Sequence, residues 1–274
     1  MLSFDWNGEP LLTISEGKPP APPRNVDAVT LCDWLNTPPT GRHLVSWEGE
    51  QKRILTFPDQ PTAMSPFLQR FEDGWIDVMP RGGAACLRDS NGQQRGDIFN
   101  LGDAIEDVQT TPSGDIWVGY FDEGVYGGGI GQSGLVCFDA QGQAQFKYNA
   151  VAAERHLPPI DDLYAMNVVG ESEIWICYYA DFPIVRLERF DSFQAWPEVA
   201  AIRGLGVSEG SIFAARAYKK DELFRADLEK GMWRTSPITA VDLAGEPIAA
   251  PFTTLARRNV MGILTQTAAY VAKL

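Results

Sequence analysis

Short runs of β-branched and aromatic residues alternate with glycine-rich polar turns along most of the chain. One pattern recurs, a turn followed by a strand centred on an aromatic residue, as in Gly74–Val78, Gly114–Tyr120, Glu173–Tyr178 and Gly210–Arg216. A second apolar run follows each copy and ends in a polar turn such as Asp139–Gly142. This composition predicts strands joined by hairpins, and the lack of a 3.6-residue period argues against helical repeats.

The repeated unit has a regular length. Its first strands are predicted to begin near Phe67, Ile105, Leu163, Ile202 and Phe252, and the intervals from Phe67 to Ile105 and from Leu163 to Ile202 are 38 and 39 residues. Four strands in about 40 to 45 residues are the period of a β-propeller. We therefore predict an all-β fold, a β-propeller of six four-stranded blades. Five or seven blades are the alternatives, because the first unit matches least well.

The whole chain, residues 1–274, is predicted to be one domain. Residues 1–17 contain Phe4-Asp5-x-x-Gly8, which repeats the Phe-Asp-x-x-Gly hairpin at Phe138–Gly142. We expect this N-terminal segment to complete the last blade and so close the ring without a free sheet edge. The proline-rich residues 18–25 would cross to the first blade. The blades would span about residues 26–62, 63–101, 102–158, 159–197, 198–246 and 247–274.

One unit carries a family resemblance. Gly114–Gly119, followed by Gly134–Asp139, resembles the repeats of bacterial sensor-associated propellers of the two-component-regulator type, which read G-x-I-W-[IV]-G-T and then G-[LI]-x-x-[FY]-D. Tyr120–Gly127 departs from that repeat and is similar to a segment of uncharacterised bacterial propeller proteins. The resemblance implies the fold and leaves the function open.

The composition and charge of the chain limit the kinds of partner that it is expected to bind. The formal net charge of −13 disfavours a nucleic acid or an anionic membrane as partner, and no basic stripe offsets it. The four cysteines show no CxxC spacing and the two histidines no paired spacing, which disfavours a zinc site. The N-terminus lacks a secretory leader and no apolar run approaches about 20 residues, so a cytoplasmic location is expected. The oligomeric state stays open.

The blade topology predicts where a site would lie. In a propeller, the loops that join one blade to the next and the loops between the second and third strands share one face. Six residues after the repeated aromatic come Arg81, Glu123, Asp181 and Lys219, which predicts a ring of charge on that face. Its candidate ligand-binding residues are Arg81, Asp103, Glu106, Asp122, Glu123, Tyr126, Tyr178, Asp181, Arg216 and Lys219. The plainer interpretation is that these are solvated loop charges, ion-paired between blades.

Three functions are compatible with this pattern. The first is a propeller that binds a small molecule or a protein on its charged, tyrosine-rich face. The second is a hydrolase or lyase that uses carboxylates or a metal at the mouth of the central channel. The third is a structural scaffold. No cofactor is evident. The carboxylates Asp103, Glu106 and Asp107 suggest Ca²⁺, although the chain lacks the Asp-x-Asp-x-Asp-Gly loop.

Overall fold

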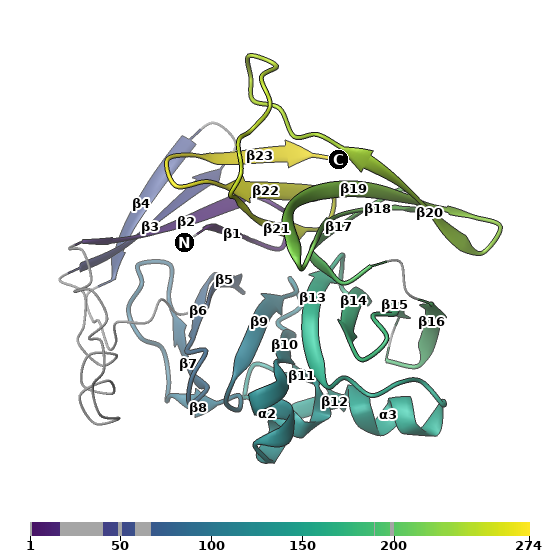
Figure 1. The fold of residues 1–274 in the computed structure, drawn as a ribbon. Helices are drawn as coiled ribbons and strands as arrows, with labels where there is room; N and C mark the ends of the chain where they lie inside the picture. Colours follow the sequence, from purple (N-terminus) through teal and green to yellow (C-terminus); the bar gives the residue numbers. More distant parts are fainter. Residues whose placement is uncertain (1, 17–40, 49–50, 58–66, 189, 198–199) are drawn as a thin grey trace, which may run out of the picture.

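The computed structural model describes residues 2–16, 41–48, 51–57, 67–188, 190–197 and 200–274. These residues form six antiparallel sheets arranged in a ring (Figure 1), which confirms the predicted six-bladed β-propeller. Five sheets have four strands each, and the last sheet has three in the described part of the chain. In each sheet the strands follow one another in sequence order.

The first three sheets lie in the N-terminal half. The first contains β1 (Leu2–Phe4), β2 (Pro10–Glu16), β3 (Gly41–Glu48) and β4 (Gln51–Phe57); the second contains β5 (Phe67–Phe71), β6 (Gly74–Val78), β7 (Ala84–Arg88) and β8 (Phe99–Asn100); the third contains β9 (Ile105–Thr110), β10 (Ile116–Tyr120), β11 (Leu135–Phe138) and β12 (Ala144–Lys147).

The other three sheets complete the ring. The fourth contains β13 (Asp162–Val168), β14 (Glu173–Tyr179), β15 (Ile184–Glu188) and β16 (Ser192–Trp196); the fifth contains β17 (Ile202–Ser208), β18 (Ser211–Arg216), β19 (Lys219–Glu229) and β20 (Met232–Ile238); the sixth contains β21 (Thr253–Arg257), β22 (Val260–Leu264) and β23 (Ala269–Lys273).

Short helices interrupt this pattern around the third blade. The α-helix α2 (Asp122–Tyr126) and the 3-10 helix η1 (Gly129–Ser133) occupy the connection between β10 and β11, and α3 (Tyr148–Glu154) follows β12. The glycine-rich run after Tyr126 is therefore built into a compact connection on the loop face. Within the described part of the chain, no helix is long and apolar enough to cross a membrane.

The recurring aromatic residue of the second strand packs between blades. Trp117 on β10 is fully buried and belongs to a cluster that includes Leu163 and Ile176 of the next blade. Trp175 on β14 occupies the same place one blade later, against Ile202 and Phe224. Burial of apolar surface between successive sheets is the main source of stability in such a ring.

The placement of the N-terminal segment differs from the prediction. We expected residues 1–17 to complete the last blade, but β2 pairs with β3, so β1 and β2 are the inner half of the first blade. The reason is that the Phe-Asp-x-x-Gly signal specifies only a local turn: Asp5 Oδ1 accepts hydrogen bonds from the backbone N–H groups of Asn7 and Glu9. Such a turn can join any two adjacent strands. The predicted crossing at residues 18–25 lies outside the described residues.

The N-terminal segment still closes the ring, by packing. Strand β1 contacts β21 and β22 of the last blade. Gly262 permits this approach, because a Cβ atom there would lie 2.9 Å from Cζ of Phe4 and 3.0 Å from Cδ2 of Leu2. The inner strands β1, β5, β9, β13, β17 and β21 then surround the centre of the ring (Figure 1).

Candidate functional site

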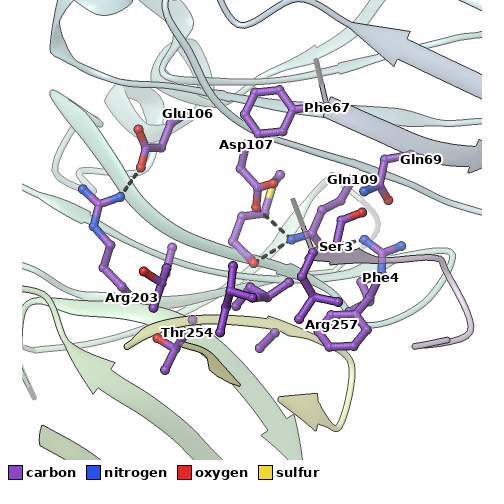
Figure 2. Close-up of a pocket in the computed structure, with 18 of the residues that line it drawn as sticks. Ser3, Phe4, Phe67, Gln69, Glu106, Asp107, Gln109, Arg203, Thr254 and Arg257 are labelled. Carbon is purple, nitrogen blue, oxygen red and sulfur yellow. Dashed lines mark hydrogen bonds and ion pairs between the residues drawn. The ribbon is translucent and has the colours of Figure 1, made fainter. Parts of the chain in front are cut away.

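A cavity of about 350 Å³ lies at the centre of the ring, and all six inner strands contribute to its wall. Most of the wall is apolar, with Phe4, Phe67, Leu163 and Leu255 among its side chains. Its polar members are Ser3, Gln69, Glu106, Asp107, Gln109, Tyr164, Arg203, Thr253, Thr254 and Arg257. Figure 2 shows Glu106 and Arg203 at one side of the cavity, and Gln69, Gln109 and Arg257 at the other.

A buried hydrogen-bond network closes the inner end of the cavity. Gln109 and Arg257 are only 5% and 2% exposed. The Arg257 guanidinium donates to Oε1 of Gln109 and to the backbone carbonyl of Thr110. Gln109 Nε2 donates to Oδ2 of Asp107 and to the carbonyl of Met166, each at 2.9 Å. These bonds join β9, β13 and β21 at the inner end of the cavity. We call Gln109 and Arg257 the floor of the cavity.

The opposite end is open to solvent. Glu106 and Arg203, near the starts of β9 and β17, form an ion pair in which the Arg203 side chain is 42% exposed. The Arg203 guanidinium also lies 4.9 Å from the ring centroid of Tyr164, whose hydroxyl is 2.7 Å from that of Tyr218. Tyr218 is 72% exposed. This mouth lies on the face that carries the predicted site loops.

Burial raises the pKa of two carboxyl groups near the cavity. For Asp107 it raises the pKa to about 6; the hydrogen bond from Gln109 opposes this rise and the charge of Glu106 adds to it. For Asp162, at the start of β13, burial also raises the pKa to about 6, with Glu106 and Asp122 adding to the effect. One oxygen of Asp162 is buried without a hydrogen-bond partner among the described residues. Protonated carboxyl groups near neutral pH can donate hydrogen bonds or protons.

Several predicted site residues meet on the loop face but outside the cavity. Arg81 forms an ion pair with Glu123 of the neighbouring blade, and its guanidinium lies 4.8 Å from the Phe121 ring centroid. Asp103 accepts hydrogen bonds from the backbone N–H groups of Gly82 and Ala104. These side chains fix the loop between β6 and β7 against the loop before β9, as the structural interpretation of the ring of charge expects.

Other predicted residues are scattered. Asp122, in the first turn of α2, accepts a hydrogen bond from the backbone N–H of the adjacent Glu123. A hydrogen bond with Asp161 raises the pKa of the exposed Tyr126. Asp181 is exposed on the turn between β14 and β15. Tyr178 is fully buried: its hydroxyl bonds to the Tyr148 hydroxyl and the Pro158 carbonyl. The prediction that Tyr178 faces a ligand is therefore wrong, because its ring packs between blades.

The last two predicted residues share one partner. Arg216, at the end of β18, and Lys219, at the start of β19, both pair with Glu222 of β19, at 3.3 and 3.0 Å. Arg216 also lines a smaller cavity of about 300 Å³ that shares Tyr164, Arg203 and Thr253 with the main one. Of the ten predicted ligand-binding residues, Glu106 alone lines the main cavity; Asp107, which was suggested only as a calcium ligand, lines it as well.

The three carboxylates suggested as calcium ligands do not form a cluster. Asp103 binds backbone N–H groups, Glu106 pairs with Arg203, and Asp107 accepts from Gln109, so the three carboxylates do not converge. Across the described ranges, no three His, Cys, Asp or Glu side chains are grouped as a metal site would require.

The sequence pattern did not predict the residues of the floor, nor Arg203 at the mouth. Gln69, Gln109, Arg203 and Arg257 lie in inner strands, whose apolar runs we interpreted only as the first strand of each blade. The signal that could have found them is a polar or charged side chain inside such a strand. In a ring of sheets, these positions face either the channel or a neighbouring blade.

Comparison with known proteins finds structures of similar fold and one family model that matches part of the chain. The model of the YxzG family, a family of uncharacterised proteins, matches residues 135–245. No curated protein matches the chain.

Solved structures of similar fold are distant in sequence. Virginiamycin B lyase from Staphylococcus aureus has a TM-score of 0.55 at 10% identity, over 98% of this chain and 78% of the lyase. A streptogramin B lyase has a TM-score of 0.51 at 12% identity, over 99% and 89%. The extracellular domain of the putative hybrid two-component system BT3049 from B. thetaiotaomicron has 0.50 at 11% identity, over 81% and 31%. At these identities the likeness shows a shared β-propeller fold and nothing more.

Proposed function

We propose that the protein binds a small molecule in the central cavity, through the mouth formed by Glu106, Arg203 and Tyr164. The observation that carries this proposal is the cavity itself, about 350 Å³ with an apolar wall and a few convergent polar groups. Ligand sites of small molecules occupy roughly 300–1,000 Å³ and have this composition. The rigid floor and the exposed mouth provide a closed and an open end.

A blocking substitution tests the location of the site. Thr253 is exposed, lies on β21 and lines both the main cavity and the smaller one beside it. Thr253→Trp is expected to fill the mouth while leaving the strand intact. The matched control is Thr235→Trp, at an exposed position of the outer strand β20.

The experiment is a fragment screen by ligand-observed NMR and thermal shift on the wild-type protein. We expect fragments that bind wild type and Thr235→Trp alike and lose binding to Thr253→Trp. A screen without any binder contradicts the proposal, as does binding that Thr253→Trp leaves unchanged.

A second candidate function is carboxyl-assisted hydrolysis or lysis in the same cavity. It is favoured by the raised pKa of about 6 for both Asp107 and Asp162, because acid–base groups work best when their pKa is near the working pH. The fold likeness to two lyases supplies no chemistry at 10–12% identity. Turnover that disappears in Asp162→Asn, with ligand binding retained, would distinguish catalysis from binding alone.

A further inference from the structure

The smaller cavity beside the mouth, about 300 Å³, offers different groups from the main one. Two guanidinium groups line it, those of Arg203 and Arg216, and none of its described lining residues is acidic. Its other polar groups are four hydroxyls, of Tyr164, Tyr218, Thr253 and Thr254. In a chain with a formal net charge of −13, this is a local excess of hydrogen-bond donors and positive charge.

The two arginines are held in place and open to solvent. Strands β17 and β18 pair so that Arg203 lies opposite Ala215, next to Arg216. The Arg203 guanidinium lies 4.9 Å from the ring centroid of Tyr164, and the Arg216 guanidinium 5.3 Å from that of Phe224. The two side chains are 42% and 39% exposed, so a ligand can reach groups that are already oriented.

The ion pairs that these arginines form leave donors for a ligand. Glu106 contacts Nη1 of Arg203, and Glu222 lies 3.3 Å from Nε of Arg216. Neither carboxylate lines the smaller cavity, and Glu222 is shared with Lys219. A guanidinium carries five N–H donors, so one carboxylate contact does not saturate it.

These groups favour a carboxylate over other charged or neutral groups. A cation would meet two guanidinium groups, and a neutral group would gain no attraction between opposite charges. A carboxylate can accept charge-assisted hydrogen bonds from both arginines. Because Glu106 and Glu222 already offset part of the positive charge, one negative charge fits better than the charge of about −2 on a phosphate monoester.

The tyrosine pair adds a donor. The hydroxyls of Tyr164 and Tyr218 are 2.7 Å apart, and only one of their two protons can lie between them. Burial raises the pKa of Tyr164, so its hydroxyl keeps its proton at neutral pH. The second proton is therefore available to a ligand oxygen.

The remaining wall is apolar. Phe252, Ala215 and Ala217 are buried and line the smaller cavity beside the two tyrosine rings. An aromatic or aliphatic group can pack there while its carboxylate faces the arginines.

We propose that the smaller cavity is a second binding site, for a monocarboxylate with a compact apolar body, whose carboxylate is bound by Arg203 and Arg216. The site goes beyond the proposed function, because Arg216 and Tyr218 line the smaller cavity and not the main one.

The first test compares ligands of one shape and different charge. Benzoate, benzamide and benzamidine are an anion, a neutral molecule and a cation at pH 7, and phenyl phosphate is the more highly charged anion. Saturation-transfer NMR at millimolar concentration measures the Kd of each for the wild-type chain. We expect benzoate to bind at least tenfold more tightly than benzamide or benzamidine, and more tightly than phenyl phosphate.

The second test uses Arg216→Gln. Its matched control is Arg234→Gln, which removes an exposed arginine that pairs with Glu229 on the outer strand β20. Exposed ion pairs contribute little to stability, so both variants should keep the Tm of wild type. The Kd of benzoate should rise about tenfold or more in Arg216→Gln, the effect of losing a charged hydrogen bond, and stay unchanged in Arg234→Gln.

A third variant tests the tyrosine pair without changing a charge. Tyr218→Phe should raise the Kd of benzoate about two- to fivefold, because it removes one hydroxyl proton. Tyr126→Phe, at another exposed tyrosine of the loop face, should leave this Kd unchanged. Both tyrosines are more than two-thirds exposed, so neither change should lower the Tm.

The outcomes separate this inference from the proposed function. Thr253→Trp narrows both cavities, whereas Arg216→Gln alters the smaller one alone. Benzoate binding that is lost in Thr253→Trp and unchanged in Arg216→Gln would place benzoate in the main cavity and overturn the second site. Absence of benzoate binding also overturns it, as does equal or tighter binding of benzamide, benzamidine or phenyl phosphate. In each case, fragments that lose binding in Thr253→Trp and keep it in Arg216→Gln would still support the proposed function.

Discussion

The guanidinium of Arg81 and the carboxylate of Glu123 form an ion pair across neighbouring blades, 42 residues apart in sequence. The sequence predicts that both residues lie on the same loop face. There, a Glu123 carboxylate without an ion-pair partner would be a candidate to bind a cation. Because Arg81 occupies that carboxylate, the pair joins the loop between β6 and β7 to helix α2. The hydrogen bond that Arg81 donates to the Glu123 carboxylate raises the pKa of the Arg81 guanidinium.

Glu123→Gln should therefore affect stability slightly and ligand binding not at all. The side chains of Arg81 and Glu123 are 45% and 61% exposed, and exposed ion pairs contribute about 0–1 kcal/mol. Urea unfolding should show a loss within that range, and Kd values for fragments in the central cavity should stay as in wild type. A tenfold weaker Kd would return Glu123 to the binding site.

Trp117→Ala should cost about 3–5 kcal/mol of unfolding free energy, the usual range for a large buried aromatic side chain. Trp117 is fully buried, and its ring centroid lies 5.7 Å from that of Phe146. Trp117→Phe should lose less, because the indole N–H has no hydrogen-bond partner among the described residues and its removal has no bonding cost. A loss below about 1 kcal/mol in Trp117→Ala would contradict this packing.

Acidification should stabilise the fold through Asp107. Its pKa is about 6 in the folded protein against an ordinary value of 3.8, so the folded state binds more protons between these two values. Stability contributed by this group therefore falls as pH rises through about 4 to 6 and is lowest above that window.

Asp107→Asn removes this titration. At pH 7 its Tm should exceed that of wild type by about 2–4 °C, the shift that about 1 kcal/mol produces in a domain of this size. The difference should shrink as the pH approaches 4. Asp97→Asn, at an exposed position of the second blade, is the control and should follow wild type at every pH. A Tm difference that is the same at pH 4 and pH 7 would exclude Asp107 as its source.

The Glu106–Arg203 pair should matter more for binding than for stability. Burial raises the pKa of Glu106, and Arg203 partly offsets this rise. A double-mutant cycle with Glu106→Gln and Arg203→Met should give a coupling in unfolding free energy of at most about 1 kcal/mol, since Arg203 is partly exposed. The same variants should weaken fragment binding at the mouth. A coupling of several kcal/mol with unchanged binding would make the pair structural.

The ring of sheets was predictable because its repeat is carried by side chains that pack between blades. Trp117 and Trp175 occupy equivalent positions one blade apart, and each is surrounded by apolar residues of the next blade. Such positions must be apolar in every blade, so they leave a period in the sequence. The turn at Asp5–Gly8 carries no comparable information about the sheet to which its strands belong.

The cavity was less predictable for a physical reason. Glu106 was identified by its loop, whereas Gln69, Gln109 and Arg257 come from separate inner strands and meet only when the ring closes. Their roles depend on one another: Arg257 can be buried because Gln109 and the Thr110 carbonyl accept from it. A pattern along the chain records which face of a strand is apolar, but it does not record which polar groups from distant strands will pair.

The packed contact between β1 and the last blade has a consequence for how the protein folds and unfolds. Five of the six boundaries between sheets are crossed by the polypeptide, so two sheets that separate there stay tethered. At the sixth, Leu2 and Phe4 pack against Gly262, and the Arg258 guanidinium donates to the Trp6 carbonyl at 3.4 Å, so the contact joins segments far apart in the sequence. Because these segments are so far apart in the sequence, this contact has the largest loop-closure entropy of the six boundaries, and we expect it to form last. The floor of the cavity includes Arg257, beside this boundary, so the shape offered to a ligand is complete only when the two end blades have met.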